Sequence, residues 1–253
     1  PEATELARAL RTLRRIETTP AAHTELSHAL HVACSLALCA YATDTPATPR
    51  MVASEPAALE MQLRSATNGA RAVLYLVRLP RRRRPLAILS IKGSTLGAPG
   101  TPPLSDWRAN LAVFGGRVAY LTGCVPADVE VHSGFADYAD ALISALECTS
   151  TAMLSDAQRR EWRLPRGQIS LWALLSSTAM DDVLLVGHSL GGACAALCAA
   201  SLGTPPRGRR RRWRRRRRAP LLVTFGAPVV GNAAWRRLQE SVVAPRGGVR
   251  CIN

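Results

Sequence analysis

The sequence predicts an α/β fold in which a mainly parallel sheet is flanked by helices. From residue 70 onward, short apolar runs of strand length alternate with longer segments of helical periodicity. One apolar run, 183–186, enters a Gly-rich turn that is followed at once by a stretch of small residues. With 253 residues, of which 47% are hydrophobic, the chain is long enough to bury one large core.

The first 69 residues are predicted to form a helical segment before the main domain. Residues 4–16 and 24–41 are rich in helix-forming residues. Residues 55–66 predict a third helix, and Asn68-Gly69 marks the break after it. These boundaries leave 70–253 for an α/β domain.

A β-hairpin is predicted at the start of that domain. Two apolar runs flank an Arg-Pro turn at 78–85, and residues 86–91 are nearly all apolar, as in a strand covered on both faces. Residues 94–104 are rich in Gly, Pro and Thr and predict a loop. The Ser-Asp pair that follows predicts the cap of a short helix over 105–111.

Strands and helices alternate through the rest of the chain, which favours parallel strands joined by helical crossovers. Residues 149–166 are expected to be an irregular insert, and the arginine-rich stretch 203–220 a loop. The predicted helices cover 134–148, 168–178 and 233–243, and the predicted strands lie at 129–132, 183–186, 221–225 and 249–252.

The net charge of +15 comes almost entirely from two arginine runs, with four arginines at 81–84 and ten between 207 and 218. Such runs can attract nucleic acid or anionic lipid, but they also occur as solvated loops that like charges keep extended. No nucleic-acid-binding motif surrounds either run. We therefore favour solvated loops and expect no specific nucleic-acid partner.

The seven cysteines show no C-x-x-C pair and no spacing typical of a metal site. Cys194 and Cys198 lie one helical turn apart, and we expect them to be small core residues. The cysteine pattern favours a reducing compartment over a disulfide scaffold. No cofactor and no metal are expected.

The turn Gly187-His188-Ser189-Leu190-Gly191 has the pattern G-x-S-x-G. In such a turn the serine adopts a strained backbone conformation that projects its hydroxyl above the sheet edge, and larger residues at the two glycines would collide. The helix that follows directs free N–H groups at the same point. Ser189 is therefore the predicted nucleophile, and the Leu190 N–H a predicted oxyanion donor. His188 is expected to point away from the hydroxyl.

Five ordered stretches resemble motifs of the class 3 (fungal-type) lipases, which have the α/β-hydrolase fold. The last one departs from the family pattern at Val229, where arginine is usual. The resemblance covers roughly 70–253 and implies a lipase or carboxylic ester hydrolase that degrades acylglycerol-type lipids. The stretches are SIKGS (90–94), LSDWRANL (104–111), VHSGF (131–135), VLLVGHSLGGACAAL (183–197) and VTFGAPVVGN (223–232).

The resemblance also implies roles for individual residues. Ser189 corresponds to the nucleophile, and Ser94 to the residue that gives the second oxyanion N–H. Trp107 would lie on the lid-like segment and face a lipid surface, with simple helix packing as the alternative. His132 matches a structural histidine of the family and not its catalytic base. The implied partner is an acyl lipid.

In this family an aspartate and then a histidine follow the serine, but neither residue type occurs after Ser189. The only acidic residue there is Glu240, within a predicted helix. We therefore expect a C-terminally truncated chain that lacks its triad aspartate and histidine and is inactive as it stands. Two alternatives stay open: a non-catalytic lipid-binding or scaffold descendant of the fold, and an arginine-rich nucleic-acid-binding protein on the same scaffold.

Overall fold

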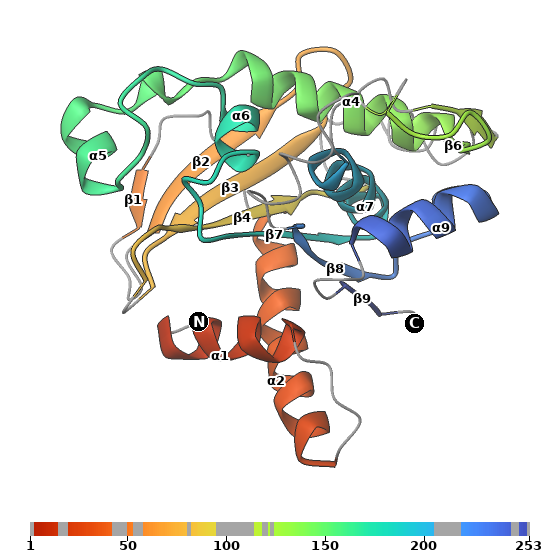
Figure 1. Cartoon of the computed structure of the whole chain (residues 1–253), viewed down its shortest axis with the longest axis horizontal. Helices are drawn as coiled ribbons and strands as arrows, with labels where there is room; N and C mark the ends of the chain where they lie inside the picture. Colours follow the sequence, from red (N-terminus) through yellow and green to blue (C-terminus); the bar gives the residue numbers. More distant parts are fainter. Residues whose placement is uncertain are drawn as a thin grey trace.

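The structure is a computed structural model that describes residues 3–14, 20–41, 50–52, 58–79, 82–94, 114–117, 121, 124–204, 219–243 and 248–251. Its centre is a seven-stranded sheet with the strand order β1-β2-β3-β4-β7-β8-β9 (Figure 1). A separate pair joins β5 to β6. The strands are β1 (Arg50–Val52), β2 (Ala58–Arg64), β3 (Arg71–Val77), β4 (Leu86–Ile91), β5 (Phe114–Gly116), β6 (Val131–His132), β7 (Asp182–His188), β8 (Leu221–Phe225) and β9 (Gly248–Cys251).

The large sheet is mixed. Strands β1 to β4 pair in antiparallel fashion, whereas β4, β7, β8 and β9 pair in parallel. The antiparallel half arises because its strands are joined by short turns, while the parallel half needs the longer helical connections. The predicted α/β class is confirmed, and the predicted hairpin of β3 and β4 is present.

The helix predicted over 55–66 is wrong, because residues 58–64 of this segment form strand β2. All seven residues of β2 pair with β3. Leu59, Met61 and Leu63 are buried and alternate with polar residues, which is the two-residue period of a strand. Helix-forming residue types such as Glu, Met and Gln hid this period in the sequence. The expected boundary near residue 69 thus lies in the turn between two strands of one sheet.

Helices cover both faces of the sheet (Figure 1). The first two lie on one face and pack on β4, β7 and β8, and most of the others lie on the opposite face. Two short helices, η2 and α5, occupy the segment 149–166 that was expected to be irregular, and α6 is shorter than the helix predicted over 168–178. The helices are α1 (Ala3–Arg14), α2 (Pro20–Cys39), α4 (Ser133–Cys148), η2 (Thr151–Met153), α5 (Asp156–Glu161), α6 (Leu171–Leu175), α7 (Leu190–Gly203) and α9 (Ala233–Val242).

The two hydrophobic layers meet at the central strands. Every residue of β4 is buried, as predicted for a strand covered on both faces. Leu89 and Leu185 belong to the core formed with α4 and α7, whereas Ile88 and Leu184 belong to the core formed with α1 and α2. Burying one such side chain stabilises the fold by about 1.5 to 3 kcal/mol, so both faces hold β7 firmly in place.

Helix α7 is almost entirely buried between β4, β7, α4 and α9, and its small residues allow this close packing. Cys194 and Cys198 are fully buried in it, as expected for core residues. Loss of solvation raises the pKa of both thiols. The negative charge of a neighbouring group raises each pKa further: that of Cys198 acts on Cys194, and that of Asp140 acts on Cys198.

We expect Cys194 and Cys198 to resist dithionitrobenzoate in the folded protein, because thiolate formation is opposed by burial. Cys148, which is exposed, is the internal control and should react at once. All of them should react after unfolding in urea. Rapid labelling of Cys198 in the folded state would contradict this protection.

The burial of these two thiols should also make the stability of the protein depend on pH. Since the unfolded chain releases the thiol protons more easily, the free energy of unfolding should fall as the pH rises above the ordinary thiol value of 9.0.

Candidate active site

Ser189 lies between β7 and α7 with an unusual backbone conformation. Its φ is +56° and its ψ is −128°, a region that residues with side chains rarely adopt. Outlying backbone conformations of this kind cost about 1 to 3 kcal/mol and cluster at functional sites. A strained serine at a strand-to-helix junction is the geometry expected of a nucleophile elbow.

Backbone hydrogen bonds from two elements hold this conformation. The Ser189 N–H donates to the carbonyl of Phe225, at the end of β8, over 2.9 Å. The Ser189 carbonyl accepts the N–H groups of Gly192 at 2.9 Å and Ala193 at 3.2 Å in the first turn of α7. The strain is therefore maintained by β8 and α7 together and not by the turn alone.

The two elbow glycines are required for different steric reasons. A Cβ at Gly187 would lie 2.3 Å from the Gly191 carbonyl oxygen, inside the turn itself. A Cβ at Gly191 would lie 2.2 Å from the Ile91 carbonyl oxygen, on the neighbouring strand β4. Gly191 thus allows the elbow to pack against the end of β4, a contact that sequence reasoning did not foresee.

The end of β4 is also where the predicted second oxyanion donor lies. Ile91 pairs with Gly187, so the chain leaves β4 beside the elbow. A Cβ at Gly93 would lie 2.4 Å from the His188 carbonyl oxygen, which shows how closely this segment approaches. Ser94 follows directly and is half-buried. Leu190 is the first residue of α7, so its N–H group has no acceptor within the helix. This N–H and Ser94 lie at the same edge of the sheet as Ser189.

His188 contacts the end of the N-terminal helical pair. The hydroxyl of Tyr41, just after α2, lies 3.2 Å from the His188 Nδ1. The Lys92 ammonium lies 5.7 Å from the centre of the Tyr41 ring. Tyr41 therefore links α2 to the elbow and to the end of β4. Sequence reasoning missed it, because a tyrosine at the end of a helix has no local signal for such a contact.

The remaining candidates lie in structural positions. His132 on β6 stacks on Phe135 of α4, with ring centres 4.2 Å apart, and its backbone N–H donates to Val230. Glu240 lies on the exposed side of α9, where it accepts a hydrogen bond from Arg236 at 2.9 Å. These contacts assign His132 to the core and Glu240 to the surface.

Other predictions concern parts of the chain outside the described residues. These are Trp107 with the short helix over 105–111, and the second arginine run between 207 and 218. Within the described part of the chain, no cluster of His, Cys, Asp or Glu is suited to hold a metal ion. The helices described there include none of the length and apolarity needed to cross a membrane.

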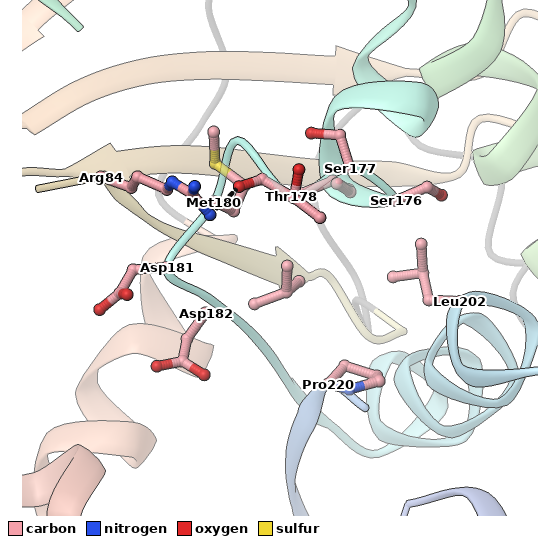
Figure 2. Close-up of a pocket in the computed structure, with 11 residues that line it drawn as sticks. Arg84, Ser176, Ser177, Thr178, Met180, Asp181, Asp182, Leu202 and Pro220 are labelled. Carbon is pink, nitrogen blue, oxygen red and sulfur yellow. Dashed lines mark hydrogen bonds between the residues drawn. The ribbon is translucent and has the colours of Figure 1, made fainter. Parts of the chain in front are cut away.

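The cavity in Figure 2, of about 140 Å³, is not part of this site. It is lined by Asp181 and Asp182, which lie at the start of β7, whereas Ser189 follows the end of that strand. A strand of this length spans about 20 Å. A second cavity, of about 320 Å³, lies between α7 and α9 and is lined by Gly192 and Trp235.

A match to a family model decides the identity of this fold. The model described as lipase (class 3) matches residues 95–246, which is more than half of the chain. The chain belongs to the class 3 lipase family. Its fold is accordingly of the α/β-hydrolase type.

Solved structures of fungal lipases resemble this class 3 lipase chain at low sequence identity. Lip2 lipase from Yarrowia lipolytica is 16% identical with a TM-score of 0.51, over 87% of this chain and 67% of that one. A lipase from Rhizopus microsporus var. chinensis is 15% identical with a TM-score of 0.45, over 98% and 63%. The chain thus spans less than two thirds of the latter's length. A search of curated protein sequences finds no relative.

Proposed function

We propose that Ser189 is the nucleophile of a carboxylic ester hydrolase that acts on acylglycerol-type lipids. The observation on which this rests is the strained backbone of Ser189 at the junction of β7 and α7. Membership of the class 3 lipase family supports an acyl lipid as the substrate. We also propose that the protein contacts the surface of its lipid substrate.

In the proposed reaction the Ser189 Oγ attacks the ester carbonyl carbon while its proton passes to a base. The negative charge that develops on the carbonyl oxygen is stabilised by the backbone N–H groups of Leu190 and Ser94. The C–O bond to the alcohol then breaks, and the alcohol leaves with the proton. Water hydrolyses the resulting acyl-serine and restores the hydroxyl.

We propose that these 253 residues by themselves do not hydrolyse esters at an enzymatic rate. No aspartate or histidine follows Ser189 in the sequence, and His188 and His132 have the structural contacts described above. Without a base the hydroxyl keeps its proton and is a weak nucleophile. The structural contacts of His188 and His132 favour a second candidate, a non-catalytic lipid-binding protein with the lipase fold.

Added imidazole separates the two candidates, because it can act as a base in place of a histidine side chain. We expect it to raise the hydrolysis of p-nitrophenyl butyrate at least about tenfold, a part of the 10² to 10⁴ that a positioned base contributes. The Ser189→Ala variant, measured with the same imidazole, corrects for the reaction in solution. Equal rates for the two proteins would favour the lipid-binding candidate.

A further inference from the structure

We propose that a cavity lined by arginines, on the sheet edge opposite Ser189, binds a phosphate-type dianion. This arginine cavity has a volume of about 110 Å³. It lies where the β3–β4 hairpin turn meets the end of α5, beside the cavity shown in Figure 2. The residues that line it include Arg78, Arg82, Arg83, Arg84, Trp162 and Arg163.

Two of the five guanidinium groups are neutralised by carboxylates. Arg78 forms an ion pair with Glu161 at 3.4 Å, and Arg82 forms one with Asp181 at 2.5 Å. Both pairs are partly exposed, so they are worth little energetically and can rearrange around a ligand. They leave three further arginines in the cavity without a carboxylate partner in the described part of the chain.

The other three arginines make only neutral contacts or none. Arg84 donates to the carbonyl of Thr178, and Arg163 donates to the carbonyl of Arg83 at 3.1 Å. For the Arg83 guanidinium itself, the described residues provide neither a hydrogen-bond acceptor nor an ion-pair partner. A carbonyl does not cancel a full positive charge. The cavity therefore holds an excess of three positive charges that an anion would compensate.

The backbone keeps Arg163 in this cluster. Arg163 has a φ of +54° just after α5, at a position where glycine is usual. The Leu164 N–H donates to Arg159 at 2.9 Å and the Arg163 N–H to Arg160 at 3.1 Å, which is the Schellman pattern at a helix end. This conformation directs the chain so that the Arg163 side chain contacts the hairpin turn.

Trp162 is a buried residue beside the arginine cavity. Its side chain is only 1% exposed, and its buried Nε1–H has no hydrogen-bond partner among the described residues. Buried indole N–H groups normally have an acceptor, since leaving one unpaired is costly. Trp162 lines the arginine cavity, and the Arg78 guanidinium lies 5.1 Å from its ring centre.

The chemistry favours a phosphate group over a carboxylate. Guanidinium groups donate in pairs to adjacent oxygens, and several of them around one centre match a tetrahedral, doubly charged anion. The cavity is several times larger than the roughly 30 Å³ that a water molecule occupies, so it admits such a group. The ligand is inorganic phosphate or a phosphomonoester, and a lipid headgroup of this kind has the same chemistry.

Calorimetric titration with inorganic phosphate tests the assignment. We expect saturable binding by the wild-type chain and about tenfold weaker binding by Arg83→Gln, an exposed residue whose change leaves the fold intact. The matched control is Arg237→Gln on α9, which removes the same charge from an exposed site and should bind as the wild type does.

Vesicles distinguish the two sources of the phosphate. A lipid headgroup is indicated if the chain floats with phosphatidic acid vesicles but not with phosphatidylcholine vesicles, and if phosphate and Arg83→Gln each release it. Free phosphate or a soluble phosphomonoester is indicated if phosphate binds and neither vesicle does. The proposal is overturned if phosphate binding is not saturable, or if Arg83→Gln binds phosphate as tightly as the wild type.

Discussion

A form of the protein that continues beyond Asn253 with an aspartate and a later histidine, in the family order, should hydrolyse p-nitrophenyl butyrate about 10⁴ to 10⁶ times faster than the 253-residue chain. The elbow and both predicted oxyanion donors already lie at one sheet edge in this chain. The addition therefore supplies only the base and the group that orients it. Loss of these two groups typically costs a serine hydrolase a factor of this size.

Ser189→Ala gives the decisive comparison, because its effect should depend on the base. In the extended form we expect this substitution to remove nearly all of the increase in the rate of p-nitrophenyl butyrate hydrolysis. In the 253-residue chain it should change that rate little. Residues that act as one catalytic unit show this kind of non-additivity. Ser241→Ala, on the exposed side of α9, is the matched control and should have no effect in either form. A fast extended form that tolerates Ser189→Ala would contradict the proposed nucleophile.

Gly191→Ala should destabilise the protein by about 3 kcal/mol or more, which corresponds to a fall of about 10 °C in the melting temperature for a chain of this size. The new Cβ would lie 2.2 Å from the Ile91 oxygen and 2.9 Å from the Gly93 nitrogen. Both are backbone atoms at the end of β4 and cannot rotate away as a side chain can. The elbow must therefore separate from the end of β4, and the two proposed oxyanion donors must move apart.

Gly167→Ala is the matched control, because a Cβ at that position would meet no atom within 4 Å. We expect a change of less than about 0.5 kcal/mol, as for most surface substitutions. Thermal melting monitored by circular dichroism measures both variants. If Gly191→Ala and Gly167→Ala melted at the same temperature, the close contact between the elbow and β4 would be wrong.

Much of the fold could be predicted because its signals are local. The apolar run of β4 and the helical periodicity of α4 each report burial within one stretch of sequence. The glycine–serine turn is equally local, since a tight strand-to-helix turn excludes side chains on its own. Strand β2 was predicted incorrectly because its helix-forming residue types and its two-residue burial period disagree, and pairing with β3 decided between them.

Contacts between distant segments could not be predicted in the same way. Tyr41 and His188 are 147 positions apart, and no sequence pattern around either residue predicts their contact. Gly93 approaches the His188 carbonyl closely only because β4 ends beside the elbow.

The same contrast holds for the charges. By itself, the sequence determined the α/β class, the serine turn and the two arginine runs, because each depends on neighbouring residues and on the local energetics of burial, turn geometry or charge. Only the tertiary structure decided that Arg82, Arg83 and Arg84 of the first arginine run meet Arg78, Trp162 and Arg163 in one cavity. Side chains from a hairpin turn and from a helix end come together there because packing the sheet and helices into one core fixes where those segments lie.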